Sequence, residues 1–267
     1  MKQRLISAFC GIIVLILVLL GNQTVFDIVV TLISSMAIYE VTGAVGLRKF
    51  KFLTCFSMLL PIMLMLASYH IEAFMLAVLF SYFLVLLIIM LFSNKKYTFN
   101  NITSVFAIAT MISLVFLYVS LTRRLGNENL DVLVILIGCW ITDTCAYFSG
   151  YFFGKHKLAP EISPKKTVEG SIGGVLGVVI IMVAYAHITA NIFDLSVNTI
   201  SAIVIGLTAG VFSQFGDLCA SIIKREHNIK DFGNIMPGHG GVMDRFDSLI
   251  FVAPIVYYIL KFYPIFI

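Results

Sequence analysis

The chain has 267 residues, of which 60% are hydrophobic and only 12% charged, and its mean hydropathy is +1.02. This composition excludes a soluble globular domain and indicates many membrane-spanning helices. The net charge of +4 is not accompanied by a recognisable base-reading module, so we expect no nucleic-acid partner.

Long apolar runs follow one another from the start of the chain. A helix needs about 20 apolar residues to cross the hydrocarbon core of a bilayer, and the runs are continuous rather than alternating, which favours helices over a β-barrel. We therefore expect an all-α, polytopic integral membrane bundle of about nine transmembrane helices. It would form a single membrane domain over residues 1–267, with a five-helix part (1–121) and a C-terminal part (131–267). The candidate spans lie near residues 5–20, 24–44, 52–68, 73–93, 102–121, 131–153, 171–190, 198–223 and 248–264.

The basic residues orient this bundle. If the N-terminus is cytoplasmic, 15 of the 18 Lys and Arg residues face the cytoplasm, and only Arg123, Arg124 and Lys261 lie on the other side. The positive-inside rule therefore predicts a cytoplasmic N-terminus. The first apolar run could be taken for a signal peptide, but no small-x-small cleavage motif follows it, so we expect the helix to be retained. We expect a bacterial inner (cell) membrane as the location.

The eighth span carries a polar stripe. Ser213, Gln214, Asp217, Ser221 and Lys224 fall within an arc of about 100° on a helical projection. A carboxylate in the middle of a spanning helix costs on the order of 3 kcal/mol, so Asp217 is expected to face a hydrated or ion-filled cavity. The alternative is a structural Asp that is hydrogen-bonded across a helix interface.

Other acidic residues also lie within spans. Asp143 and Tyr147 are four residues apart on the sixth span, share one face, and are expected to join the same cavity. Three roles remain open for Asp143: a carboxylate that supports the metal ligands, a contact to the nucleotide, or a structural polar group within the bundle. Asp27 and Glu40 lie near opposite ends of the second span, and for both we favour a structural role at a helix interface.

A glycine-rich turn, Pro237-Gly-His239-Gly240-Gly241, precedes the last span. Its glycines allow positive φ and a close approach of the backbone to a ligand, and successive N–H groups in such a turn can bind an anion. His239 is an acid or base, a ligand contact or a turn residue.

Acidic residues follow this turn. Asp247 is a candidate N-cap of the last span. Asp244, together with Asp217, offers two carboxylates from neighbouring helices to a divalent cation such as Mg²⁺, which binds through one or two carboxylates and substrate phosphates.

The loop before the seventh span contains Ser163-Pro-Lys165-Lys166-Thr167. Ser163-Pro predicts an extended or turn segment. Lys166 is either a phosphate contact or a solvated charge. No Ser or Cys nucleophile with a paired base is evident, and phosphoryl or nucleotidyl transfer needs none, because positioning and charge neutralisation supply most of the acceleration.

These motifs resemble the signature of the phosphatidate cytidylyltransferases, the CDP-diacylglycerol synthases. The resemblance covers roughly residues 130–250, whereas the first five spans match in hydropathy only. Met236 stands where Leu or Ile is more usual. The matching blocks are Asp143-x-x-Ala-Tyr147-x-x-Gly150, Ser163-Pro-x-Lys166-Thr167-x-Glu169-Gly170, Ser213-Gln-x-Gly216-Asp217, Ser221-x-x-Lys224-Arg225, Lys230-Asp231-x-Gly233 and Pro237-x-His239-Gly240-Gly241-x-x-Asp244-Arg245-x-Asp247.

The resemblance implies a Mg²⁺-dependent reaction of CTP with phosphatidic acid at the cytoplasmic membrane surface, giving CDP-diacylglycerol and pyrophosphate in phospholipid biosynthesis. It implies that Asp217 and Asp244 hold the metal within a catalytic C-terminal part, and it allows a second cation and a homodimer. We expect Asp217, Asp244 and Lys224 to be catalytic, with Asp143, Tyr147 and Asp247 around them. The expected substrate and phosphate contacts are Lys166, Thr167, Ser213, Ser221, Arg225, Lys230, His239, Gly240, Gly241 and Arg245.

Two rival hypotheses remain at this point. A related membrane enzyme, such as a CTP-dependent polyprenol kinase or a synthase acting on ether lipids, would use similar residues. A transporter would use Asp143 and Asp217 on an ion pathway. It is expected to show broken spans in two repeated halves, and the sequence shows no such repeat.

Overall fold

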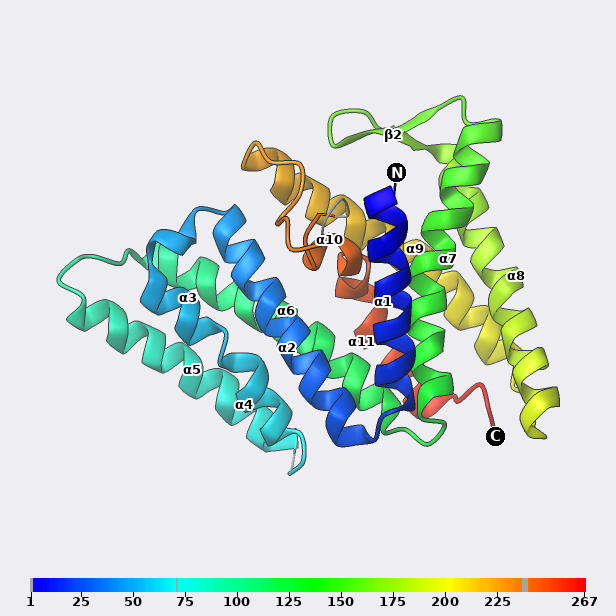
Figure 1. Cartoon of the computed structure of the whole chain (residues 1–267), viewed down its shortest axis with the longest axis horizontal. Helices are drawn as coiled ribbons and strands as arrows, with labels where there is room; N and C mark the ends of the chain where they lie inside the picture. Colours follow the sequence, from blue (N-terminus) through cyan, green and yellow to red (C-terminus); the bar gives the residue numbers. More distant parts are fainter. Residues whose placement is uncertain (1, 71, 237–239) are drawn as a thin grey trace. The chain divides into compact units, whose positions relative to one another are not determined.

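The computed structural model describes residues 2–70, 72–236 and 240–267 (Figure 1). Within these ranges the chain is helical apart from one short antiparallel hairpin and the connecting loops. The elements are α1 (Lys2–Leu20), α2 (Gln23–Ala44), the 3₁₀ turn η1 (Leu47–Lys49), α3 (Lys51–Ser57), α4 (Leu60–Ala67), α5 (Glu72–Phe92), α6 (Phe99–Arg123), α7 (Asn129–Phe153), β1 (Lys157–Ala159), β2 (Ser163–Thr167), α8 (Val168–Phe193), α9 (Thr199–Glu226), α10 (Met243–Phe246) and α11 (Leu249–Phe262).

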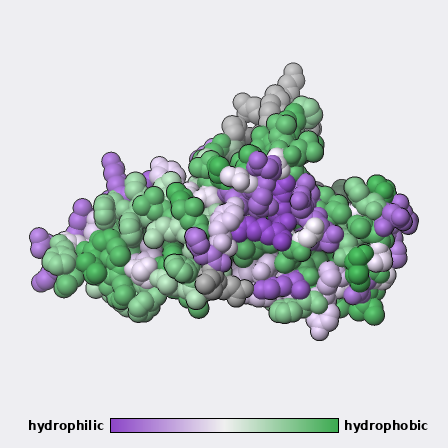
Figure 2. Space-filling view, turned by 90° about the horizontal axis from the view of Figure 1, so that it is seen from below, coloured by the Kyte–Doolittle hydropathy of each residue, from purple (hydrophilic) through white to green (hydrophobic). Residues whose placement is uncertain are grey.

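Six of the described helices are long and apolar enough to cross a membrane: α2, α5, α6, α7, α8 and α9. Apolar side chains cover much of the face shown in Figure 2, as expected for a protein surrounded by lipid. The chain is thus an α-helical integral membrane protein, as its composition predicted. The first expected span lies within α1, and the other two correspond to shorter helical stretches, Lys51–Ala67 and Leu249–Phe262. The count of nine therefore stays a prediction.

The third expected span, 52–68, is not one continuous helix. It divides into α3 and α4 around Met58 and Leu59, and Pro61 lies in the first turn of α4. Proline has no N–H group and is favoured in a first turn, which explains why a new helix begins there. The Ser35 hydroxyl on α2 donates a hydrogen bond to the Met58 carbonyl at 3.0 Å. A backbone carbonyl group at the break between the two helices therefore has a hydrogen-bond partner within the protein.

The chain forms two compact units. One comprises Met1–Leu117 together with Ile229–Arg245, and the other comprises Tyr118–Asn228 together with Phe246–Ile267. Two of the three boundaries fall inside α6 and α10, and the third follows the end of α9. The first unit has fully buried side chains on successive helices, including Ile38, Leu64 and Tyr82. In the second unit α8 packs against α7 and α9, and α11 packs against α9.

Small residues bring α7 and α8 close together in the second unit. A Cβ atom added to Gly170 would lie 2.7 Å from the Ala146 carbonyl oxygen, and one added to Gly174 would lie 3.0 Å from the Thr142 carbonyl oxygen. Small residues allow such close backbone approach between membrane helices. Close packing of α7 and α8 therefore explains why glycine occupies positions 150 and 170 of the sequence motifs.

Candidate active site

Asp217 lies on α9, in the second unit, and forms an ion pair with Lys166 of β2. Both side chains are about one-quarter exposed, at 26% and 25%. The β1–β2 hairpin holds Lys166: Lys157 pairs with Thr167, and Ala159 pairs with Ser163. The expected extended segment at Ser163 is confirmed. Two residues that the sequence selected separately, Asp217 for a cation and Lys166 for phosphate, thus lie side by side.

Lys224, two turns after Asp217 on α9, faces Asp247 at the start of the last helix. Its Nζ lies 3.7 Å from Asp247 Oδ2, and both side chains are largely buried. Close packing at Gly216 brings this segment against α9, because a Cβ atom there would lie 2.7 Å from the Asp247 carbonyl oxygen. Gly216 therefore lets the backbone of Asp247 and Ser248 approach the polar stripe of α9 closely.

Asp247 is not the N-cap that the sequence suggested. Ser248 occupies the N-cap position of α11, and its N–H donates to Asp247 Oδ1 at 2.9 Å. The Ser248 hydroxyl is 3.4 Å from Asp143 Oδ2 and the same distance from Asp247 Oδ1. Asp247 instead joins Asp143 near the Asp217 stripe.

The three carboxyl groups of Asp143, Asp217 and Asp247 repel one another. Burial raises the pKa of Asp247 from 3.8 to about 7, and the negative charges of Asp217 and Asp143 add to this increase. Lys224 and the Ser248 N–H group oppose it only in part. Lys166 and Lys224 neutralise part of this negative charge, and the described residues contain no group of three or more His, Cys, Asp or Glu side chains arranged to hold a metal ion.

The hydroxyl-bearing residues around the cluster differ in their contacts. Thr167 is the N-cap of α8, where its side chain accepts a hydrogen bond from Gly170 N at 3.1 Å. Ser213 is fully buried, and its hydroxyl has no hydrogen-bond partner among the described residues. Ser221 is buried on the same helix. Gln214 donates to the Ser171 carbonyl at 3.2 Å. Thr167 therefore caps α8, and its contact with substrate stays a prediction, whereas the Ser213 hydroxyl is buried without a hydrogen-bond partner among the described residues.

Two further predicted residues of this unit lie at its surface. Tyr147 is 67% exposed, and its ring contacts the rings of Phe148 and Tyr151. Arg225 is exposed and donates from Nε to the Ile162 carbonyl at 3.4 Å, which ties the end of α9 to the hairpin.

Asp244 belongs to the first unit, where it is buried and organises the loop before it. Its Oδ2 accepts hydrogen bonds from Phe232 N at 2.8 Å and from Gly241 N at 3.0 Å. Gly240 has a φ of +81°, as expected for the glycine-rich turn. His239 lies outside the described residues. Lys230 and Arg245 are exposed. Because Asp217 and Asp244 lie in different units, their joint binding of a cation stays a prediction.

Glu40, for which the sequence favoured a structural role at a helix interface, contacts the loop that precedes α10. It lies on α2, is 1% exposed, and accepts a hydrogen bond from Met243 N at 3.0 Å. The two residues are 203 positions apart. The carboxylate also lies so close to two loop glycines that a Cβ on Gly233 or Gly241 would meet it at 2.5 or 2.6 Å. The sequence did contain a signal for this residue. A Glu within a predicted span has a high free-energy cost in a membrane, which indicates a specific role.

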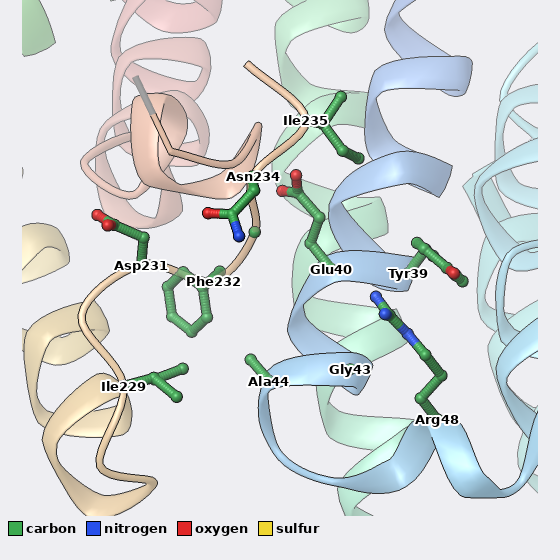
Figure 3. A pocket seen from close by; sticks show the side chains of 11 residues that line it. Tyr39, Glu40, Gly43, Ala44, Arg48, Ile229, Asp231, Phe232, Asn234 and Ile235 are labelled. Atoms are coloured by element: carbon green, nitrogen blue, oxygen red, sulfur yellow. The ribbon is translucent and has the colours of Figure 1, made fainter. Parts of the chain in front are cut away.

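A cavity of about 430 Å³ opens beside Glu40 in the same unit (Figure 3). The Arg48 guanidinium carbon lies 4.1 Å from the centre of the Tyr39 ring. In Figure 3 the Glu40 carboxylate points toward the 233–235 segment and away from Arg48. The cavity is lined by α2, Arg48 and the 229–235 segment.

The pairing of Lys166 with Asp217 and of Lys224 with Asp247 in a membrane bundle suits the binding of phosphorylated substrates. These features are those of an integral membrane enzyme or of a carrier of anionic ligands. Comparison with known proteins then decides between these. The model of the cytidylyltransferase family matches residues 2–263, so the chain belongs to the cytidylyltransferase family.

Relatives named phosphatidate cytidylyltransferase match nearly the whole chain. The protein from Bacillus subtilis (strain 168) is 35% identical over 270 residues, covering 98% of each chain. The protein from Staphylococcus haemolyticus is 33% identical over 262 residues, covering 96% of this chain and 97% of the relative. A protein of that name from Thermotoga maritima is 40% identical over 161 residues, or 58% of each chain. The family resemblance is confirmed, and the chain is a nucleotidyltransferase.

Proposed function

We propose that this protein transfers CMP from CTP to phosphatidic acid and releases pyrophosphate. The product is CDP-diacylglycerol, a precursor in phospholipid biosynthesis. The observation that carries the proposal is the charged cluster of the second unit, in which Lys166 pairs with Asp217 and Lys224 faces Asp247. Alternating cations and carboxylates suit a triphosphate and its metal ion. Relatives similar over nearly their full length carry the corresponding name.

In the proposed reaction, a phosphate oxygen of phosphatidic acid attacks the α-phosphorus of CTP in line. A new P–O bond forms there as the bond to the β-phosphate oxygen breaks, and pyrophosphate leaves with the electron pair. The attacking oxygen is already an anion, so no general base is required. We assign Lys224, Arg225 and Arg245 to phosphate oxygens, with Lys230 and the backbone of Gly240 and Gly241 nearby.

Asp217 and Asp244 would hold Mg²⁺, which binds through one or two carboxylates together with substrate phosphate oxygens. The bound ion supplies polarisation of the phosphorus and neutralises charge on the leaving pyrophosphate. The proposal allows a second cation, as in other enzymes of this chemistry. Until substrate binds, Lys166 neutralises Asp217 through their ion pair. In the proposal Lys166 then contacts the triphosphate, so that Asp217 becomes a ligand at the moment CTP arrives.

The proposed topology has nine spans, a cytoplasmic N-terminus and the site at the cytoplasmic surface of a bacterial inner membrane. The distribution of Lys and Arg residues supports this orientation. The location suits one soluble substrate, CTP, and one lipid substrate that enters laterally between helices. A homodimer is proposed by analogy with the family.

The position of the label retained from CTP tests the proposed reaction. Purified protein in detergent is incubated with phosphatidic acid, Mg²⁺ and CTP labelled either on the α- or on the γ-phosphate. We expect α-label in the lipid fraction, γ-label in pyrophosphate and neither transfer with EDTA. Release of CDP with γ-label in the lipid would identify a kinase. Uptake of a solute into reconstituted vesicles without CTP would identify a transporter.

A further inference from the structure

The N-terminal half of the chain contributes a residue to the organisation of the site. Glu40 of α2 and the 231–244 segment lie in the same unit, although they are far apart in sequence. The segment includes Asp231, the described end of the glycine-rich turn, and Asp244. Its described residues form little regular structure, so its conformation depends on side-chain contacts.

Two carboxylates, those of Asp244 and Glu40, hold this segment through hydrogen bonds to its backbone N–H groups. Asp244 accepts hydrogen bonds from the N–H groups of Phe232 and Gly241. Glu40 accepts one from Met243, the residue immediately before Asp244. The N–H group of Gly241 therefore bonds to Asp244, while its Cα side faces Glu40.

The contact with Glu40 is close on two sides. Gly233 and Gly241 both face its carboxylate, and neither position has room for a Cβ atom while Glu40 stays in place. Glu40 is almost completely buried, and its Oε1 has no hydrogen-bond partner among the described residues. Such a carboxylate costs stability where it stands. A role in holding a functional segment explains its presence better than a role in stability.

We propose that Glu40 is a positioning residue that sets the conformation of the 240–244 segment and thereby the placement of Asp244. This inference rests on the proposed function, in which Asp244 binds the metal ion. Glu40 contacts neither substrate nor metal in this scheme. It acts through the Met243 N–H group and through its packing against Gly233 and Gly241.

The length of the side chain and its acceptor oxygen are the features that matter. Glu40→Ala removes both, Glu40→Asp withdraws the carboxylate by one methylene, and Glu40→Gln keeps the length and one acceptor oxygen. A displacement of about 1 Å at a catalytic group can lower a rate by roughly 100-fold. We expect Glu40→Ala and Glu40→Asp to lower kcat to this extent and to raise the Mg²⁺ concentration for half-maximal activity. Glu40→Gln should restore most of the activity.

Asp27 provides the matched control. It is a buried acid on the same helix, hydrogen-bonded to Gln23 at 2.8 Å and to Tyr69. Asp27→Ala is expected to lower the melting temperature but to leave kcat and the Mg²⁺ requirement of the folded, gel-filtered enzyme unchanged. Gly241→Ala provides a second test, since its methyl group would displace Glu40. We expect it to slow turnover, and the double variant with Glu40→Ala to be no slower than either single variant. Gly11→Ala, where a Cβ meets open space, is its control.

The assay is transfer of α-phosphate label from CTP to lipid, with every variant purified in the same detergent. If the wild type transfers label and Glu40→Ala and Glu40→Asp match it in kcat and Mg²⁺ requirement, the inference is wrong. It is equally wrong if Glu40→Ala loses activity only in proportion to its loss of folded protein. If the wild type itself transfers no label, the proposed function fails instead, so the two failures are distinguishable.

Discussion

Replacing Asp247 with Asn isolates the free-energy cost of a buried, crowded carboxylate. Asp247 is 7% exposed, and burial together with Asp217 and Asp143 raises its pKa to about 7 although Lys224 lies 3.7 Å away. Desolvation and repulsion therefore outweigh the ion pair. Asn keeps the acceptor oxygen for Ser248 N but carries no charge.

The sign of the pH dependence follows from linkage. A carboxyl group whose pKa is higher in the folded than in the unfolded state stabilises the fold fully below pH 4, and this contribution is lost as the pH rises to about 7. The loss between pH 5 and pH 8 amounts to at most about 3 kcal/mol. The stability advantage of Asp247→Asn over the wild type should therefore begin near pH 4 and grow steadily between pH 5 and pH 8, by roughly 5 to 10 °C in melting temperature over that interval.

The assay is thermal unfolding in detergent with EDTA, at constant ionic strength and scan rate, from pH 5 to pH 8.5. Asp231→Asn, which changes an exposed carboxylate of the other unit, is the control and should show no such trend. Saturating Mg²⁺ should reduce the difference at pH 8, because a cation offsets the repulsion. A variant that is less stable than the wild type at pH 8, or equally stable throughout, would refute the reasoning.

Three other substitutions test separate parts of the account. Thr167→Ala removes the N-cap of α8 and should lower the free energy of unfolding by about 1 kcal/mol, while the folded enzyme keeps its turnover and Thr167→Ser stays close to the wild type. A large loss of turnover at unchanged stability would instead place Thr167 at the substrate. Lys166→Gln should lower kcat/KM for CTP by roughly 10- to 100-fold, the value of a hydrogen bond to a charged group, and an unchanged value in steady-state kinetics would remove Lys166 from the phosphate site. Gly170→Ala should destabilise the protein by about 1 to 3 kcal/mol through overpacking against Ala146, and a melting temperature equal to that of the wild type would contradict the close contact of α7 and α8.

The polar stripe of α9 shows what periodicity alone can predict. Helical spacing predicts that Ser213, Asp217 and Lys224 share one face, and in the structure Asp217 and Lys224 both face charged partners from other segments. The extended segment at Ser163 followed from its proline in the same way. These features depend on residues close in sequence, where spacing determines geometry.

Features that depend on distant partners could not be predicted in this way. The contact of Glu40 with Met243 joins residues 203 positions apart, and no local pattern specifies it. The free-energy cost of a Glu within a predicted span indicates that Glu40 has a specific role, but it does not identify the residue that Glu40 contacts. The break between α3 and α4 is easier to predict from the sequence, because Pro61 within an expected span already disfavours a continuous helix.

The most direct test of the central claim is the binding of Mn²⁺, an octahedral substitute for Mg²⁺, measured by electron paramagnetic resonance in the presence of CTP. We expect the wild type to bind Mn²⁺ and Asp217→Asn and Asp244→Asn each to weaken binding at least about tenfold, as losing a metal ligand should. The double variant should be little worse than either single one, because both acids serve one ion. Unchanged Mn²⁺ affinity in both single variants would contradict the claim that Asp217 and Asp244 hold the catalytic cation.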